Sequence, residues 1–80
     1  MTTGYTVDQR LDCKGLNCPL PIIKTKKAIE KMAVGQVLEV IATDPGSTPD
    51  MIAWSKGTGH ELLETREEGG LFTFYVRKAK

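Results

Sequence analysis

Residues 11–21 read LDCKGLNCPLP, and within them the chain changes from a strand to a helix. Apolar and polar side chains alternate over residues 7–13, which is the pattern of a half-buried strand. Pro19 then opens a predicted helix, because a proline in the first turn has no N–H group that needs a partner. We expect this helix to cover residues 19–34 and to end at Gly35 as its C-cap.

Downstream of Gly35 the sequence predicts three more strands and a second helix. The strands are expected at residues 36–43, 60–67 and 71–77, and the helix at 47–56, with Ser47 or Thr48 near its N-cap and Gly57 and Gly59 at its end. Each β-α-β crossover makes its flanking strands parallel, and the last two strands form an antiparallel hairpin. The predicted fold is a two-layer α/β sandwich of order β-α-β-α-β-β, in which two helices cover one face of a mixed four-stranded sheet.

The size and composition of the chain limit the classes of protein to which it can belong. Its 80 residues are enough for one domain spanning residues 1–80, and we expect a monomer. A formal net charge of +1 gives no electrostatic reason to expect direct nucleic-acid binding. The sequence contains neither an apolar run of ~20 residues nor the pattern of a signal peptide, so no membrane association is expected. With only two cysteines, we expect a cytoplasmic protein with reduced thiols.

Cys18 is the candidate reactive residue. It comes immediately before the predicted helix, whose free N–H groups and dipole favour a nearby negative charge. A thiol in that position tends to have a lowered pKa, and the thiolate is the form that attacks another sulfur. Pro19 and Pro21 stiffen the adjacent backbone. From spacing alone, a buried structural cysteine remains the alternative, since free cysteines are often buried.

The segment Cys18-Pro19-Leu20-Pro21, preceded by Leu11-Asp12 and Gly15-Leu16, resembles the C-P-x-P signature of the TusA/SirA-like sulfur-carrier family. The Thr43-Asp44-Pro45-Gly46 loop, the Gly59-His60-Glu61 strand entry and the final hairpin extend the resemblance over nearly the whole chain. The resemblance implies a fold like the C-terminal domain of translation initiation factor 3. We expect no cofactor.

The resemblance also implies a function. Cys18 would accept sulfane sulfur as a persulfide from a protein donor, either a cysteine desulfurase or another sulfurtransferase, and relay it to an acceptor protein. Gly15, Asn17, Pro19 and Pro21 would support the thiol. The chain would be an enzyme only in the sense that it forms a covalent persulfide intermediate. Acceptors in the family serve tRNA thiolation, molybdenum cofactor assembly or sulfur oxidation, and the sequence does not distinguish them.

Two other function classes stay open, and both concern the role of the cysteines. A thiol redox protein would use a Cys13–Cys18 disulfide, and a regulatory interaction domain would need neither thiol. Cys13 alternates with Leu11 and is expected to face the core. Four residues separate the two cysteines, unlike the two of a redox or zinc motif, and one His leaves a zinc site short of ligands.

The first helix has two contrasting faces. At 100° per residue, its core face is expected to contain Ile22, Thr25, Ala28, Ile29 and Met32. The opposite face is expected to form a partner-docking surface beside Cys18, made of Leu20, Ile23, Lys24, Lys27 and Lys31. Of the remaining polar residues, Asp44 is expected to order its loop and His60 to lie on the surface, whereas Trp54 is expected to complete the core.

Overall fold

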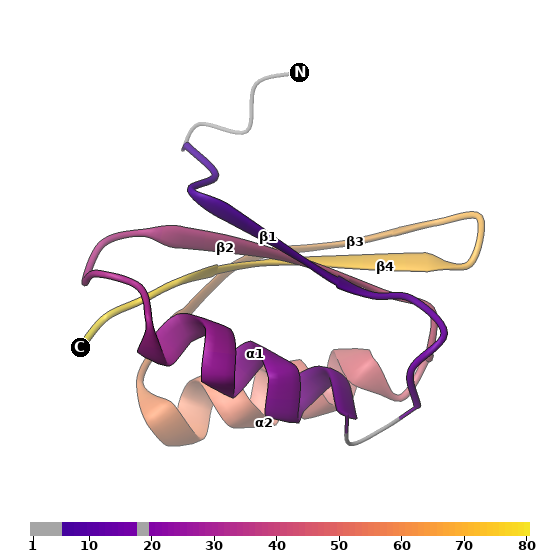
Figure 1. Ribbon diagram of the computed structural model, residues 1–80. Helices are drawn as coiled ribbons and strands as arrows, with labels where there is room; N and C mark the ends of the chain where they lie inside the picture. The colour runs from indigo at the N-terminus through magenta and orange to yellow at the C-terminus, as the bar shows by residue number, and fades with distance from the viewer. Residues whose placement is uncertain (1–5, 18–19) are drawn as a thin grey trace.

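In the described part of the chain, four strands and two helices follow one another in the predicted order β1-α1-β2-α2-β3-β4 (Figure 1). The structure is a computed structural model that describes residues 6–17 and 20–80. The elements are β1 (Gln9–Cys13), α1 (Leu20–Glu30), β2 (Val37–Ala42), α2 (Ser47–Thr58), β3 (Glu61–Glu68) and β4 (Leu71–Arg77). The strand boundaries therefore lie within two residues of the predicted ones.

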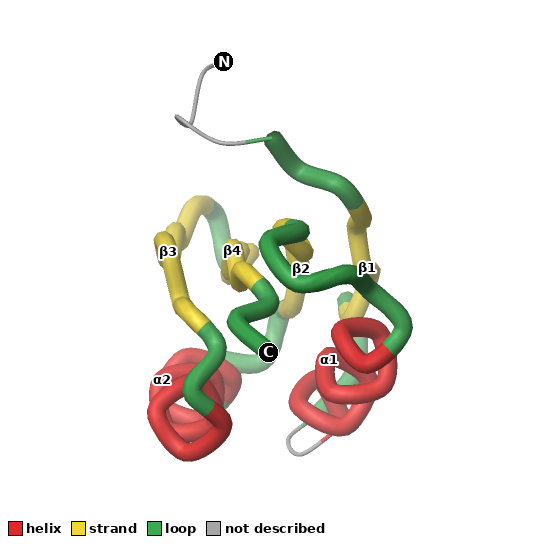
Figure 2. The backbone as a smooth tube through the Cα atoms, turned by 90° about the vertical axis from the view of Figure 1, so that its left-hand side faces the viewer, coloured by secondary structure: helices red, strands yellow, loops and turns green. Residues whose placement is uncertain are grey.

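The sheet has the strand order β1-β2-β4-β3. β1 runs parallel to β2, with Leu11 opposite Val40, and β4 runs antiparallel to both of its neighbours. Two glycines with positive φ, Gly69 and Gly70, form the tight turn between β3 and β4, since a turn of this kind needs residues without a Cβ. Both helices pack against one face of the sheet (Figure 2), so the predicted two-layer α/β fold is confirmed.

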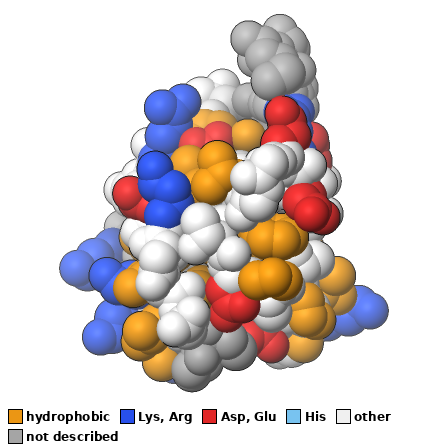
Figure 3. Space-filling model, turned by 90° about the vertical axis from the view of Figure 1, so that its right-hand side faces the viewer, with side chains coloured by type: hydrophobic (Ala, Val, Ile, Leu, Met, Phe, Trp, Pro, Cys, Tyr) orange, Lys and Arg blue, Asp and Glu red, His pale blue; other side chains and the backbone are white. Residues whose placement is uncertain are grey.

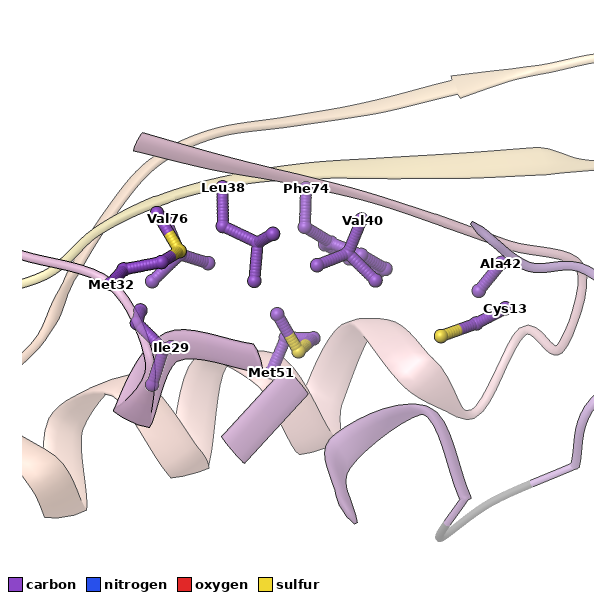
Figure 4. Packing of buried hydrophobic residues seen from close by; sticks show 9 residues of the cluster. All are labelled: Cys13, Ile29, Met32, Leu38, Val40, Ala42, Met51, Phe74 and Val76. Carbon is purple, nitrogen blue, oxygen red and sulfur yellow. The ribbon is translucent and has the colours of Figure 1, made fainter. Parts of the chain in front are cut away.

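The core lies between the sheet and the two helices (Figure 4). The strands contribute every second residue, because successive side chains point to opposite faces of a sheet. The fully or almost fully buried members are Cys13, Leu38, Val40, Ala42, Phe74 and Val76 from the sheet, with Ile29, Met32 and Met51 from the helical layer. Trp54 packs against this cluster at its edge, as expected.

The first helix ends earlier than the sequence predicted, at Glu30 and not near Val34. Gly35 is therefore not its C-cap. The N–H of Gln36 donates to the carbonyl of Ala33 at 3.1 Å, which places Gly35, with φ 93°, at the third position of a tight turn that leads into β2.

A lysine from the other end of the chain helps to terminate α1. The Nζ of Lys78 donates to the carbonyl of Met32 at 2.7 Å and lies 3.4 Å from that of Glu30. Lys78 also exchanges backbone hydrogen bonds with Gly35 and Gln36, at 2.8 and 2.9 Å. The carbonyls at the end of a helix lack intrahelical partners, so this C-terminal tail fixes where α1 stops.

Candidate functional site at the strand ends

One end of the molecule brings together the carboxyl ends of β1 and β2 and the starts of α1 and α2 (Figure 1). Parallel β-α units produce this arrangement, because each strand ends at the edge where the next helix begins. Figure 3 looks onto this end, where hydrophobic and acidic side chains are interspersed and most Lys and Arg side chains lie along one side. The loops at this end therefore form the candidate site.

The loop after β1 is held by three backbone N–H groups. The N–H of Lys14 donates to Oδ1 of Asp12 at 2.9 Å, and that of Leu16 donates to the carbonyl of Cys13 at 3.2 Å. Gly15 has a φ of 81°, a backbone conformation that side chains with a Cβ rarely adopt. Its N–H donates to Oγ1 of Thr43 at 2.9 Å, which ties this loop to the loop after β2.

Thr43 was not among the residues that the sequence predicted for the site. Two signals pointed to it: the Thr43-Asp44-Pro45-Gly46 loop belongs to the family resemblance, and loops that follow neighbouring parallel strands meet at one edge.

The start of α1 is built from Asn17 and Pro21. The carbonyl of Asn17 accepts the N–H of Leu20, the first residue of α1, at 2.9 Å. Pro21 is buried, and its carbonyl accepts a 2.7 Å hydrogen bond from the buried hydroxyl of Thr25 one turn later. Cys18 and Pro19 lie outside the described residues. The residues before and after these two, Asn17 on one side and Leu20 and Pro21 on the other, are thus held by the fold.

Cys13 points into the core next to Ala42 and is fully buried (Figure 4). Burial raises the pKa of its thiol, because a thiolate is poorly solvated there; the charge of Lys24 opposes this shift and that of Asp12 adds to it. The inward orientation predicted from the alternation in β1 is confirmed. Cys13 is therefore held as a neutral thiol without contact with solvent.

The outer face of α1 carries the residues expected for partner docking. Leu20 and Ile23 are exposed over 44% and 43% of their surface, respectively. Lys24, Lys27 and Lys31 are also exposed. The inner face is buried at Thr25 and Ile29 and half-buried at Ile22 and Ala28, so the predicted helix phase is correct within α1. Lys31 and Met32, which were expected on the helix, lie after its last residue, Glu30; Lys31 is exposed and Met32 is buried.

The start of α2 differs slightly from the prediction. Gly46 is its N-cap, and Ser47 is the first helical residue. Asp44 orders the preceding loop as expected: its Oδ1 accepts the N–H of Gly46 at 3.0 Å, and its carbonyl accepts that of Ser47 at 3.0 Å. The Ser47 hydroxyl is buried and has no hydrogen-bond partner within the described part of the chain.

His60 lies at the start of β3, away from this site. Its Nδ1 accepts the N–H of Ala79 at 3.1 Å, and its ring lies 5.5 Å from that of Trp54. Among residues 6–17 and 20–80, no three His, Cys, Asp or Glu side chains are grouped to hold a metal ion. No helix in the same residues is long and apolar enough to span a bilayer.

The family model described as "Sulfurtransferase TusA" matches residues 9–78, which is almost the entire chain. The chain belongs to the TusA family. It is 58% identical over 72 residues to the sulfur carrier protein TusA of Allochromatium vinosum, covering 90% of this chain and 95% of that protein. It is 52% identical over 71 residues to the putative sulfur carrier protein YrkI of Bacillus subtilis, with 89% and 95% of the two chains covered.

A solved structure supports the same fold. The SirA-like protein from Desulfitobacterium hafniense superposes with a TM-score of 0.77 at 24% identity, over 90% of this chain and 99% of that one. The resemblance to the TusA/SirA-like family drawn from the C-P-x-P segment is thereby confirmed.

Proposed function

We propose that this TusA family member is a sulfur carrier that accepts sulfane sulfur as a persulfide on Cys18 and relays it to an acceptor protein. The observation that carries the proposal is the fold on either side of Cys18 in the sequence: Gly15, three residues before it, is tied to Thr43, and Leu20, two residues after it, begins α1. The free N–H groups of a helix start stabilise a thiolate just before it. Family membership and the relatives named as sulfur carriers support the same function.

The proposed transfer needs no cofactor. The Cys18 thiolate attacks the terminal sulfur of a persulfide on the donor, a cysteine desulfurase or another sulfurtransferase. A new S–S bond forms on Cys18, the donor's S–S bond breaks, and the electron pair leaves with the donor thiolate. In the second step an acceptor thiolate attacks the terminal sulfur on Cys18, and the Cys18 thiolate is the leaving group. Sulfane sulfur is transferred and no external oxidant is consumed.

The supporting residues have separate roles in this proposal. Gly15 and Asn17 set the path of the chain into the motif, and Pro21 anchors the first turn to the core. Pro19 restricts the backbone directly after the thiol. The outer face of α1 would receive both partners: Leu20 and Ile23 by apolar contact, and Lys24, Lys27 and Lys31 by attraction to acidic groups.

The burial of Cys13 argues against a dithiol mechanism, because a buried neutral thiol is a poor nucleophile. We further propose that the chain acts as a cytoplasmic monomer, since reduced thiols and alternating partners suit a carrier.

The test is the intact mass of the protein after incubation with a cysteine desulfurase and cysteine. We expect the wild type and Cys13→Ser to gain one sulfur atom that is lost on reduction, and Cys18→Ser to gain none. Loss of two hydrogens instead, in the wild type alone, would indicate the Cys13–Cys18 disulfide. Equal loss of loading in both folded variants would refute the assignment of Cys18 as the single carrier residue.

A further inference from the structure

Within residues 6–17 and 20–80, no second layer of secondary structure lies over the face of the sheet opposite the helices (Figures 1 and 2). Its residues follow from the alternation of the strands. Because Val40 and Phe74 point into the core, their neighbours Glu39, Ile41, Thr73 and Tyr75 point away from it. We refer below to the side of the sheet that carries these residues as the open face.

Tyr75 is nearly buried on the open face, with 6% of its surface exposed. The guanidinium of Arg66 lies over its ring at 5.7 Å from the ring centre. Burial raises the pKa of Tyr75, as does the hydrogen bond that its hydroxyl makes with Glu39. Glu39 in turn accepts from Nε of Arg10 at 3.0 Å, and Arg66 pairs with Glu64. These contacts link all four strands.

A groove of about 230 Å³ opens beside this network. Its apolar lining includes Ile41, Leu71 and the ring of Tyr75, and its charged lining consists of Glu39, Arg66 and Glu68. Leu71 is 42% exposed, a large fraction for a leucine within a strand. All of these residues are on strands, so the groove is formed before any partner arrives, and binding there orders few groups.

The open face has an excess of negative charge. Its carboxylates are Asp12, Glu39, Glu61, Glu64 and Glu68, whereas its guanidinium groups are Arg10, Arg66 and Arg77. The outer surface of α1 has the opposite sign, because it carries Lys24, Lys26 and Lys27 with Glu30 as its acidic residue, and Lys31 follows directly after the helix. The near-neutral net charge of the chain is therefore divided between two surfaces of opposite sign.

We propose that the groove on the open face is a second docking surface, which binds a segment of a partner protein with an apolar side chain next to an Arg or Lys. The apolar side chain would cover Ile41 and Leu71, and the cation would meet Glu68 at the end of the groove. This inference goes beyond the proposed function and does not depend on persulfide chemistry. A partner held in the groove would leave accessible the outer face of α1, which is the proposed docking surface for acidic partners.

The test is an NMR titration of the full-length Cys18→Ser chain, labelled with ¹⁵N, by two capped peptides. The probe is GLRLKG, and the matched control GLELEG has the same apolar residues with reversed charge. We expect saturable shifts of amides in β2 and β4 around the groove with GLRLKG, with a Kd of about 1 mM. GLELEG should shift none of these amides.

Two variants keep the experiment decisive. Glu68→Lys should weaken binding of GLRLKG by about threefold or more, and Leu71→Ser should weaken it similarly with an unchanged fold, since both side chains are exposed. Lys24→Glu should leave it unchanged. Equal shifts with both peptides, shifts confined to α1, or no shifts at about 5 mM peptide would overturn the proposal. Because Cys18 is absent from this protein, the result is independent of sulfur transfer.

Discussion

At the scale of single residues, the two cysteines occupy different places along the chain, five positions apart, and only Cys13 lies within the described residues. Cys13 ends β1 with its side chain inside the core, whereas Cys18 comes just before α1. The alternation of Leu11 and Cys13 was enough to predict the inward orientation. The pKa of Cys13 is raised by burial, so its thiolate is scarce near neutral pH.

We predict that iodoacetamide modifies Cys18 roughly a hundredfold faster than Cys13 in the native protein, since Cys13 reacts only when the core opens. The measurement is peptide mass spectrometry over a time course at pH 7.5. The control is the same reaction in denaturant, where the two rates should converge. Comparable native rates would show that Cys13 is accessible, and the argument against a dithiol mechanism would then fail.

The hydrogen bond between Thr43 and Gly15 could not be predicted from the sequence. It joins residues 28 positions apart. The sequence pattern predicts that the two loops meet at one edge, because both follow parallel strands. It does not specify which hydroxyl faces which N–H, since that depends on the packing of β1 against β2.

At the scale of elements, the periodicity of α1 predicted its faces correctly and its end incorrectly. The apolar residues Ile22, Ile29 and Met32 repeat at helical spacing, which fixes the phase. The end depends on Lys78, which lies 46 positions from Met32 in the sequence. The sequence predicted Gly35 as the C-cap because helices often end at a glycine with positive φ. A tight turn uses such a glycine equally well, and Gly35 lies in a turn.

We predict that Lys24→Glu combined with Lys27→Glu slows sulfur transfer and weakens its dependence on salt. Both lysines are exposed on α1, where positive charge speeds the encounter with an acidic partner. Leu20→Ser should also slow transfer, because an exposed leucine beside Cys18 contributes to the interface and little to the core. The measurement is the transfer rate from a loaded donor, paired with a thermal melt of each variant.

The matched control on the same helix is Ile29→Ser, which should lower the Tm strongly because Ile29 is 1% exposed. The Tm of the Lys24, Lys27 and Leu20 variants should stay within about 3 °C of the wild type. Unchanged transfer rates in all of these surface variants would remove the docking role of this face.

We predict that Lys78→Met lowers the free energy of unfolding by about 1 kcal/mol, because the carbonyl of Met32 loses its charged donor. Hydrogen exchange in the last turn of α1 should increase at the same time. Urea denaturation gives the first quantity and NMR the second. Lys26→Met, on the exposed middle of α1, is the control and should change neither. An unchanged exchange rate at residues 28–32 would contradict this account of the helix end.

At the scale of the whole molecule, the alternation of apolar and polar residues and the positions of Gly and Pro between elements were enough to predict the two layers and the strand directions. The strand order places β4 between β2 and β3, so Tyr75 lies between Glu39 and Glu64. The groove on the open face could not be predicted from the sequence, because its residues come from three strands and each strand alone shows only ordinary alternation.

We predict that the protein becomes less stable as the pH falls, because His60, which joins β3 to the C-terminal tail, then takes up a proton. Burial, and then the charges of Lys78 and Lys80, lower the pKa of His60 in the folded state below its unfolded value of about 6.5. The unfolded chain therefore binds the proton more readily. The contribution of neutral His60 is fully present above that unfolded value and is lost as the pH falls through the folded one.

Thermal melts of the wild type and His60→Gln between pH 8 and pH 5 measure this effect. The carboxylates titrate in both proteins, so the difference in Tm between the two isolates His60. We expect the wild type to lose more stability than the variant as the solution is acidified below about pH 6.5. A difference in Tm that stays constant with pH would show that the Ala79 N–H bond to His60 does not control stability.

The C-terminal tail has a practical consequence for handling the protein. Lys78 and Ala79 are held against the turn before β2 and the start of β3, and the C-terminus lies at the end of the molecule opposite the loop between β1 and α1 (Figure 1). A tag or fluorophore attached after Lys80 therefore departs on the side away from that loop. Chains anchored to a sensor surface through such a tag will present the strand-end loops to solution, so partner exchange can be timed on immobilised protein.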